Sequence, residues 1–355
     1  MRRTFLSALC LLALVCSCRQ GNAGSDGRVI GFYNLENLFD TIHDEGKNDY
    51  QFLPEGDYHW TEDKYQAKLA NMASAIKAMA DENGQFHAVL GVAEVENDKV
   101  LDDLTACADL APAGYRYVHY ESPDQRGIDV ALLYRPDCFR VLDSETIPYT
   151  FDSGISFEMD AEQQSQFFTR DVLMVRGELD GEPFAFFVAH LPSRIGDKGA
   201  DLRCRGAEII YERAQRLAAE YPGIKMVVMG DMNDDPTDLS MTDFMHAKGH
   251  PEEVSDGEFF SPFIPMLRKG FGSLEYHGDW NIFDIIMVSS SLVNPEDGSY
   301  GIRAVADGEY ATVFKRDFLT QQDGKFAGTP HRTLSYGEFI NGYSDHYPTF
   351  IKISK

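Results

Sequence analysis

Short apolar runs recur along this 355-residue chain, and several stop at a residue that can bind a metal ion or move a proton. Runs of about four to eight residues rich in β-branched and aromatic side chains are typical of buried strands. The pattern predicts strands at 28–33, 88–92, 115–119, 130–134, 139–147, 169–179, 183–190, 226–229, 282–288 and 349–353. The three runs between 115 and 147 are predicted to form an antiparallel meander.

Apolar residues at helical spacing predict a long helix that begins at Thr61, whose hydroxyl is expected to cap it. Its apolar positions are Leu69, Met72, Ile76 and Met79. Further helices are predicted at 98–108 and 201–221, the second ended by Pro222-Gly223.

Both halves of the chain combine strands with helices, which predicts two packed sheets with helices outside. Asp180-Gly181 lies between two apolar runs and favours a tight hairpin turn. The polar stretch 152–166 is expected to be a loop. No linker or repeat divides residues 28–355, so we expect one domain of the α/β (α+β) class, with two mainly antiparallel sheets.

The first eighteen residues have the anatomy of a secretory signal. Arg2-Arg3 precedes an apolar stretch at 5–15 that is too short to span a bilayer. Val15-Cys16-Ser17-Cys18 resembles a bacterial lipobox, so residues 1–18 are expected to end at a lipidated Cys18, with 19–27 as a polar tether. An ordinary secretory signal is the alternative. The lipid would anchor an extracytoplasmic protein to a membrane, in the periplasm or at the cell surface.

The chain is strongly acidic, with 32 Lys and Arg against 57 Asp and Glu and a formal net charge of −25. This charge opposes tight nonspecific binding of nucleic acid, although a metal-loaded cleft could be locally positive. Three cysteines lie beyond the signal: Cys107, Cys138 and Cys204. Their spacing fits no zinc motif, and one disulfide is possible in an oxidising compartment, with no pair favoured. No feature of the sequence indicates a protein partner.

Five segments place Asn, Asp, Glu or His where an apolar run stops. They are Phe32-Tyr-Asn34-Leu-Glu36-Asn37, Gly91-Val-Ala-Glu94-Val, Val188-Ala-His190-Leu-Pro-Ser193-Arg194, Gly230-Asp231-Met-Asn233-Asp and Ser344-Asp345-His346-Tyr-Pro. Phosphoester hydrolysis needs a hard cation, a base for water and an acid for the leaving oxygen. Carboxylate oxygens suit Mg²⁺, so Glu94, Glu36 and Asp345 are candidate ligands. A surface acid after a strand is the plainer interpretation of Glu94.

Asp231 and Asn233 lie two residues apart after a buried run, so their side chains can point the same way. The carboxylate could orient a water molecule while the amide holds a phosphate oxygen. An Asx turn, helped by Asp234-Asp235-Pro236, is the structural alternative.

His190 and His346 are candidates for acid catalysis or for stabilising a negative transition state. Hydrogen-bonded core histidines are the alternative interpretation. A catalytic histidine usually needs a carboxylate to orient its ring. Asp284 is expected to do this for His346, and Asp129 for His190.

In this order, these residues resemble the endonuclease/exonuclease/phosphatase superfamily, which includes pancreatic-type deoxyribonuclease, abasic-site endonuclease, bacterial sphingomyelinase and inositol-polyphosphate 5-phosphatase. The resemblance runs from about Val29 to the C-terminus, and Gly230-Asp-Met-Asn233 and Ser344-Asp-His346 are its most specific parts. It implies a four-layer αββα sandwich and a metal-dependent phosphodiesterase that uses Mg²⁺, with Mn²⁺ as the alternative ion. The implied metal-site residues are Glu94, Glu36, Asp345 and Asn34. The implied catalytic residues are Asp231, Asn233, His190, His346 and Asp284.

The motif set is closest in kind to the nuclease branches, which predicts a weakly bound nucleic acid, DNA above all, as the substrate. His190-Leu-Pro-Ser193-Arg194 looks like an extracytoplasmic bacterial branch, so Ser193 and Arg194 are candidate substrate contacts. Trp280 and Asn281 could contact a base or sugar, although packing explains Trp280 equally well. Basic, aromatic-interleaved stretches typical of groove binders are lacking in the sequence. A phospholipid-headgroup or inositol-phosphate hydrolase and a noncatalytic binding lipoprotein are the alternatives.

Overall fold

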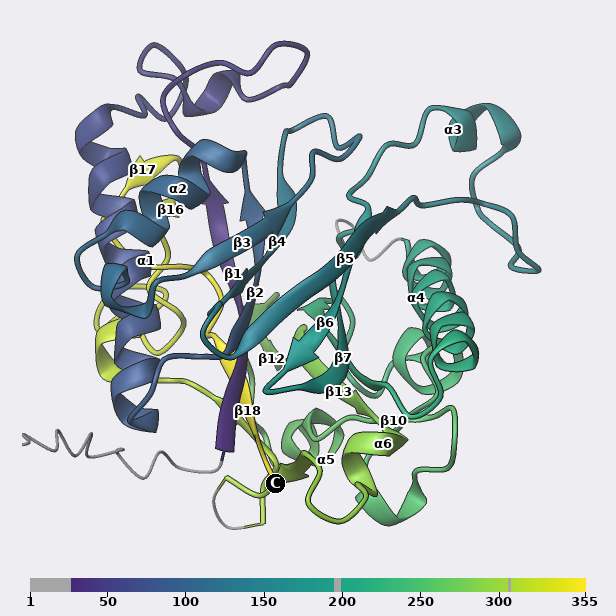
Figure 1. The fold of residues 1–355 in the computed structure, drawn as a ribbon. Helices are drawn as coiled ribbons and strands as arrows, with labels where there is room; N and C mark the ends of the chain where they lie inside the picture. Colours follow the sequence, from purple (N-terminus) through teal and green to yellow (C-terminus); the bar gives the residue numbers. More distant parts are fainter. Residues whose placement is uncertain (1–26, 195–198, 306–307) are drawn as a thin grey trace, which may run out of the picture.

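The protein is described by a computed structural model over residues 27–194, 199–305 and 308–355. Within these ranges the strands form two large sheets of seven strands each, packed face to face with helices on their outer sides (Figure 1). The architecture confirms the two-sheet α/β fold predicted from the sequence. The lipidation predicted at Cys18, and the signal and tether around it, lie outside the described residues.

The first sheet has the strand order β14-β18-β1-β2-β4-β3, with β15 also paired to β18. Its strands are β1 (Gly27–Leu38), β2 (Val89–Val95), β3 (Arg116–His119), β4 (Asp129–Tyr134), β14 (Gly301–Arg303), β15 (Ala311–Val313) and β18 (Thr349–Ser354). The β1–β2 pair is parallel and the other pairs are antiparallel. Helices α1 (Glu62–Asn83) and α2 (Asp98–Ala106) cover its outer side (Figure 1).

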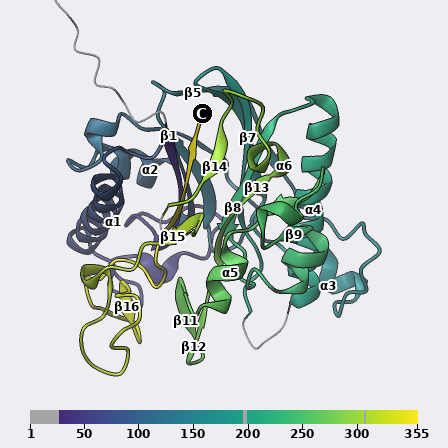
Figure 2. The same ribbon diagram turned by 90° about the horizontal axis from the view of Figure 1, so that it is seen from below.

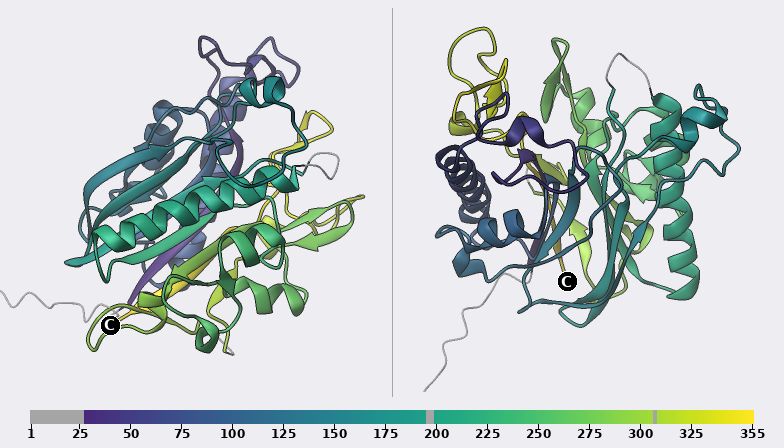
Figure 3. Two further views of the ribbon diagram at one scale, coloured as in Figure 1. Left: turned by 90° about the vertical axis from the view of Figure 1, so that its right-hand side faces the viewer. Right: turned by 90° about the horizontal axis from the view of Figure 1, so that it is seen from above.

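The second sheet has the order β5-β6-β7-β8-β13-β10-β9. Its strands are β5 (Phe139–Ile147), β6 (Val172–Leu179), β7 (Glu182–His190), β8 (Lys225–Asp231), β9 (Ala247–Lys248), β10 (Phe259–Phe260) and β13 (Asp284–Ser289). The pairs β7–β8 and β9–β10 are parallel, and the others are antiparallel. Helix α4 (Ala200–Glu220) lies along its outer side (Figure 3).

Shorter elements complete the described chain. The helices are α3 (Ala161–Ser165), α5 (Phe263–Arg268) and α6 (Ser290–Val293), with single turns η1 (Tyr50–Phe52), η2 (Ala111–Ala113), η4 (Ser240–Phe244), η5 (Pro251–Glu253) and η6 (Asp317–Leu319). Two small hairpins are β11 (Leu274–Tyr276) with β12 (Asp279–Asn281), and β16 (Leu334–Ser335) with β17 (Glu338–Phe339). Both hairpins project from the same end of the molecule (Figure 2).

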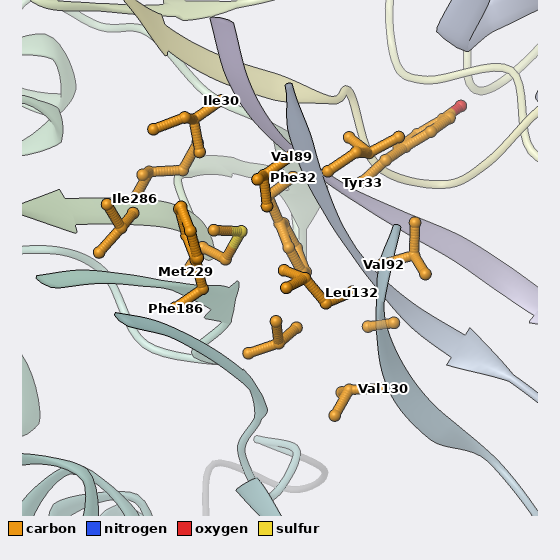
Figure 4. Close-up of a cluster of buried hydrophobic side chains, with 14 of the residues drawn as sticks. Ile30, Phe32, Tyr33, Val89, Val92, Val130, Leu132, Phe186, Met229 and Ile286 are labelled. Atoms are coloured by element: carbon orange, nitrogen blue, oxygen red, sulfur yellow. The ribbon is translucent and has the colours of Figure 1, made fainter. Parts of the chain in front are cut away.

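The main core lies between the two sheets, where β1, β2 and β4 contact β7, β8 and β13. Side chains from both sheets meet there, and Phe32, Leu132, Phe186, Met229 and Ile286 are fully buried (Figure 4). Each buried side chain of this size contributes about 1.5–3 kcal/mol relative to exposure, so this layer fixes how the two sheets lie on each other. The strand ends that carry polar residues are therefore held at one edge of a rigid core.

Several local predictions need correction. β5 pairs with β6 in the second sheet, so the predicted 115–147 meander is limited to β3 and β4. Thr61 occupies the cap position of α1, but its hydroxyl makes no capping hydrogen bond. The predicted loop 152–166 contains the short helix α3, which a capping box at Asp160 begins. The hairpin at Asp180-Gly181 is confirmed, and both residues have the positive φ that this turn requires.

The three cysteines predicted to be available for a disulfide, Cys107, Cys138 and Cys204, are all free thiols. Within the part of the chain that the structure covers, no helix has both the length and the apolar character needed to cross a bilayer.

Candidate active site

Neighbouring strand ends of the second sheet bring His190, Asp231 and Asp284 side by side. Asp231 has two register partners. His190 lies beside it in the parallel β7–β8 pair, and Asp284 lies beside it in the antiparallel β8–β13 pair. One rung earlier, Gly230 lies against Ala189, where an added Cβ would be 2.2 Å from the Ala189 carbonyl oxygen. Position 230 therefore has to be glycine for the His190 and Asp231 strands to remain this close.

The first sheet delivers its polar residues on irregular backbone. The β1–β2 register shifts between Asn34 and Leu38, and the β2–β4 register shifts between Ala93 and Val95. Glu36 and Glu94 lie in these bulges and have left-handed φ values of 47° and 62°. Non-glycine residues in this region are uncommon, and bulges next to active sites redirect side chains. In the first sheet, the polar residues that the sequence pattern placed at strand ends therefore lie in two β-bulges.

Glu94, Asn34 and Asp231 form the centre of the cluster. Asn34 Nδ2 donates to Glu94 Oε1 at 3.2 Å and to Asp231 Oδ2 at 2.9 Å. The Asn37 backbone N–H donates to Glu94 Oε2 at 2.8 Å. His190 Nε2 lies 3.9 Å from Glu94 and 3.6 Å from Asp231. Ligand-type atoms of Glu94, His190 and Asp231 all lie within 4.8 Å of one another.

Asp231 is a buried carboxylate with few compensating contacts. Its Oδ1 accepts a hydrogen bond from the Asn233 backbone N–H at 3.0 Å. Burial raises the pKa of Asp231 to about 6. The charge of His346 lowers this pKa only in part, and the charges of Asp284 and Glu94 raise it further. A carboxylate with this pKa is a suitable proton acceptor near neutral pH.

His346 is oriented by Asp284, as predicted. Its Nδ1 lies 2.7 Å from Asp284 Oδ2, and its Nε2 lies 3.8 Å from Asp231 Oδ2. Burial alone would lower the pKa of His346, but the charges of Asp284 and Asp231 raise it well above its ordinary value. The ring is thereby held as a positively charged donor at the edge of the cleft.

His190 has the opposite character. Burial lowers its pKa well below the ordinary value, and the charge of the buried Arg170 adds to the effect. The prediction that Asp129 orients this ring is wrong. Asp129 accepts from the Ser122 backbone N–H and faces His119, while His190 Nδ1 has no hydrogen-bond partner within the described chain. The register that pairs β4 with β2 and β3 points Asp129 away from β7.

Glu36 and Asp345, both predicted ligands, lie against Arg332 instead of against Glu94. Arg332 donates to Asp345 Oδ2 at 2.6 Å, and its Nε is 3.5 Å from Glu36 Oε1. Burial, with the charge of Asp345, raises the pKa of Glu36 to about 7, although Lys68 and Arg332 oppose this. Asp345 is partly exposed, and His346 and Arg332 hold its pKa below the ordinary value. The predicted ligand set is therefore divided into a Glu94–Asn34 part and an arginine-paired part.

The donor set around Glu94 fits a divalent cation. Within the described chain, neither Glu94 nor Asp231 forms an ion pair with a lysine or arginine, and the nearest nitrogen atoms of basic side chains are those of the histidine rings at 3.6–3.9 Å. Adjacent buried carboxylates without a counterion are costly, and hard oxygen donors prefer Mg²⁺ or Mn²⁺. Glu94 would hold the ion, with Asp231 and His190 beside it, since ligand-type atoms of the three residues already converge.

These groups open into a cleft with a volume of about 570 Å³. Glu94, His190, Asp231, Asn233, Asp345 and His346 line its floor together with Ser193, and Arg126, Tyr276, Phe326 and Arg332 line its walls. The hairpin β11–β12 and the segment around β16–β17 flank this end of the molecule (Figures 2 and 3).

The remaining predicted residues lie around this cleft in less direct positions. The Asn233 side chain donates to the Leu191 carbonyl, and Arg194 donates to the Asn233 carbonyl at 2.8 Å and to Asp234 at 3.0 Å. Arg194 therefore braces the 231–234 turn. Asn281 donates to the Asp279 carbonyl within its own hairpin.

Trp280 does not line the cleft. Its ring stacks on Tyr347, with ring centroids 6.1 Å apart and an interplanar angle of 11°. The ammonium of Lys315 lies 4.2 Å from the Trp280 ring centre. Packing therefore explains Trp280, as one of the two sequence interpretations expected.

Sequence reasoning missed Arg332, Lys68 and Arg126. Lys68 is fully buried in α1, donates to the Thr333 hydroxyl and, at 2.6 Å, to the Tyr343 carbonyl. The Thr333 N–H in turn donates to Glu36 at 2.6 Å. A lysine on the apolar stripe of a predicted helix was the available signal, whereas Arg332 lies in an irregular stretch without a periodic pattern.

Comparisons with known proteins identify the family and the fold. A family model described as "Endonuclease/Exonuclease/phosphatase family" matches residues 29–355. The search of curated proteins found no match. Among solved structures, D. rerio TDP2 complexed with single strand DNA product is similar, with a TM-score of 0.53 and 13% identity over 93% of this chain and 100% of that one.

Two further solved structures are similar in the same way. The human Nocturnin catalytic domain with bound sulfate anion has a TM-score of 0.52 and 15% identity over 93% of this chain and 94% of that one. A protein of the same family from Bacteroides thetaiotaomicron has a TM-score of 0.52 and 16% identity, covering 92% and 94% of the two chains. At these identities the likeness concerns the fold.

Proposed function

Because this chain belongs to the endonuclease/exonuclease/phosphatase family, we propose that it is a divalent-metal-dependent phosphodiesterase that cleaves nucleic acid. The observation that carries the proposal is the convergence of Glu94, Asp231, His190 and His346 in one cleft at 3.6–3.9 Å. Their environments make one histidine cationic and the other neutral beside a carboxylate of raised pKa. Such a divergence of pKa values is what an acid–base pair requires.

In the proposed mechanism a bound Mg²⁺ or Mn²⁺ supplies charge neutralisation at the scissile phosphate. Glu94 is the principal ligand, since Asn34 and the Asn37 N–H fix both of its oxygens. Asp231 accepts the proton of the attacking water, and Asn34 and the Asn233 N–H hold its two oxygens in position. Fixed partners of this kind allow the carboxylate to act without reorganising during the reaction.

His346 donates a hydrogen bond from Nε2 to a phosphate or leaving-group oxygen. Asp284 accepts from Nδ1, which fixes the ring orientation and stabilises its positive charge. The neutral His190 contributes one donor from Nε2 beside Glu94 and Asp231. Arg332 and Arg126, on the walls of the cleft, supply the positive charge that a polyanionic substrate needs in a protein of net charge −25.

Nucleic acid is the proposed substrate because D. rerio TDP2, which has a similar fold, is described in complex with a single strand DNA product. The acidic surface predicts weak binding that weakens further as salt increases. We also propose that Cys18 carries lipid and anchors the enzyme outside the cytoplasm, on the strength of its Val15-Cys16-Ser17-Cys18 motif. Mass spectrometry of the mature N-terminus tests this, and cleavage elsewhere with an unmodified Cys18 would contradict it.

The test of function is a substrate panel of DNA, RNA, nucleotides, sphingomyelin and phosphoinositides, assayed with Mg²⁺, Mn²⁺ and chelator at low salt. We expect the metal-loaded protein to cut nucleic acid and the chelated protein to be inactive. Hydrolysis of a lipid headgroup alone would reassign the substrate but retain the metal mechanism. Full turnover in a protein shown to contain no metal would reject the mechanism itself.

A further inference from the structure

A second cluster of metal-type side chains lies on the first sheet, apart from the cleft. His119 ends β3, Asp129 begins β4, and Glu121 lies in the connection between these strands. Ligand-type atoms of the three residues lie within 4.8 Å of one another. None of the three lines the cleft that contains Glu94 and Asp231. They adjoin a separate pocket, which His119 and Glu121 line together with Asp98.

Two buried atoms in this cluster face each other without hydrogen bonds. The His119 and Asp129 side chains are only 2% and 1% exposed. Their Nε2 and Oδ2 atoms lie 3.4 Å apart, and neither has a hydrogen-bond partner within the described chain. Leaving a buried polar atom without a hydrogen-bond partner is unfavourable, so two such atoms that face each other require an explanation.

The other atoms of both side chains are already fixed. His119 Nδ1 lies 2.9 Å from Asp98 Oδ1, and Asp129 Oδ1 accepts from the Ser122 N–H at 3.0 Å. A ring whose Nδ1–H donates to a carboxylate presents the lone pair of Nε2 on the other side. This carboxylate–histidine arrangement is the one that orients metal-binding histidines in proteins.

The spacing suits a small transition-metal ion. Metal–nitrogen and metal–oxygen bonds of about 2.0–2.2 Å at a tetrahedral angle separate the two donor atoms by about 3.4 Å. His119 Nε2 and Asp129 Oδ2 are separated by this distance. Glu121, whose side chain is 54% exposed, supplies a third donor from the solvent side, where water can complete the coordination.

From this geometry we propose that His119, Asp129 and Glu121 form a second divalent-metal site, of Zn²⁺ type, with Asp98 as the residue that orients His119. One nitrogen and two oxygen donors are compatible with Zn²⁺, whereas Mg²⁺ rarely takes imidazole. Lys47 lies 3.7 Å from Glu121 Oε2 and therefore reduces, without removing, the negative charge of the site.

The alternative to a metal ion between His119 Nε2 and Asp129 Oδ2 is a proton. Burial lowers the pKa of His119, but Asp129 and Asp98 together raise it above the ordinary value, so an imidazolium could lie between the two carboxylates. A charge-assisted hydrogen bond would shorten the contact to about 2.7–2.9 Å. The observed 3.4 Å separation fits a bridging ion better.

The site would stabilise a loop that reaches the cleft. The 120–128 connection joins the two strands of the cluster and carries Arg126, which lines the cleft. The same connection is held on its inner side by Arg170, which donates to Asp124 at 3.0 Å. A metal bound at His119 and Asp129 would fix both ends of this connection, so its occupancy would influence where Arg126 lies.

The experiment counts Zn²⁺ bound to the full mature chain after chelator treatment, in a Glu94→Gln/Asp231→Asn background that disables the cleft. We expect one Zn²⁺ per chain, with proton release on binding if His119 starts protonated. His119→Ala in this background should lose the ion, and Glu121→Gln should weaken binding about tenfold or more. Cobalt substitution should give the visible absorption of a tetrahedral site.

Glu45→Gln is the matched control, because Glu45 lines the same pocket and carries the same charge without belonging to the donor set. It should bind Zn²⁺ as the background protein does. If His119→Ala fails to fold, Glu121→Gln, at an exposed position, decides the question. The proposal is wrong if the disabled background binds no Zn²⁺, or if Glu121→Gln and Glu45→Gln bind it equally. An NMR signature of a persistent imidazolium at His119 in excess Zn²⁺ would also overturn it.

Discussion

The first sheet brings its acids to the cleft on bulged backbone, whereas the second sheet brings its acids at regular strand ends. Glu36 and Glu94 have positive φ and depend on partners from elsewhere in the chain, such as Arg332. Asp231 and Asp284 are direct register partners, so the hydrogen-bonded strands themselves place their backbones side by side. One side of the cleft is therefore held by tertiary contacts and the other by the sheet itself.

The two sides of the cleft should therefore respond differently when a charged side chain is removed. Removing a charge on the strand-end side should alter chemistry while leaving the fold intact, because the backbone rungs remain. Removing a charge on the bulged side should alter stability as well, because a buried counterion loses its partner. The following substitutions separate these effects.

The largest expected effect is on turnover. Glu94→Gln and Asp231→Asn should each lower kcat by about 10³-fold or more, since one places the metal and the other accepts the proton. Glu36→Gln, whose carboxylate faces Arg332, should cost about tenfold or less. Steady-state kinetics with saturating Mg²⁺ or Mn²⁺, beside circular dichroism of each variant, measures the contrast. Equal losses of kcat in Glu36→Gln and Glu94→Gln would contradict the division of the acids into a metal-binding part and an arginine-paired part.

Lys68→Met should lower the free energy of unfolding by about 3 kcal/mol, because it removes one of the two cationic neighbours of the buried Glu36 and leaves only Arg332. Denaturant unfolding measures the change. Adding Glu36→Gln to Lys68→Met should recover part of the loss, since the carboxylate charge is then removed. A double variant that is simply the sum of the two singles would show that the two charges are not coupled.

Asp284→Asn should lower kcat about 10–100-fold while KM changes little, because the amide cannot stabilise a cationic His346. The pH at which His346 loses its proton should fall in this variant, and NMR titration of the ring detects it. Asp129→Asn serves as the contrasting carboxylate, since Asp129 faces His119 and not the cleft. A pH profile unchanged by Asp284→Asn would leave this carboxylate with a purely structural role.

Activity should fall about tenfold per pH unit on the acid side of Asp231 ionisation. Burial raises the pKa of Asp231 to about 6, and the base form must be unprotonated, so kcat increases as pH rises through this range. A metal ion nearby favours the charged carboxylate and shifts this fall in activity to lower pH. A pH–rate profile in which activity already falls above pH 7 would contradict the assignment of Asp231 as base.

The smallest effect is expected at Trp280. Its ring packs against Tyr347 and Lys315 and does not line the cleft, so Trp280→Phe should change kcat/KM by no more than about twofold. A loss specific to longer oligonucleotides, measured against a dinucleotide, would instead make Trp280 a substrate contact.

The sequence allowed prediction of those parts of the site that follow a regular strand. Asp231 comes directly after a buried run, and Asp284 could be paired with His346 because it lies within an apolar run, where a carboxylate needs a partner. Asp129 follows the same rule, yet it faces His119, because strand register rather than position in the run decides which neighbour a side chain meets.

Tertiary contacts account for what could not be predicted. β5 has the same pattern as its neighbours β3 and β4, and nothing local indicates that it joins the other sheet. Arg332 approaches Glu36 from an irregular segment, and Lys68 acts on the charge of Glu36 from a helix, so periodicity gives no sign of either interaction. The bulges at Glu36 and Glu94 likewise depend on packing that a single strand pattern does not encode.

The glycine at position 230 has a consequence for how the cleft of this protein could be adapted to another substrate. Any side chain there would collide with the Ala189 backbone and force apart the strands that hold His190 and Asp231. Evolution in the laboratory toward another substrate would therefore keep this position unchanged. It would find its tolerated changes on the rim, in the β11–β12 hairpin and around Phe326, where side chains line the cleft without holding the strands together.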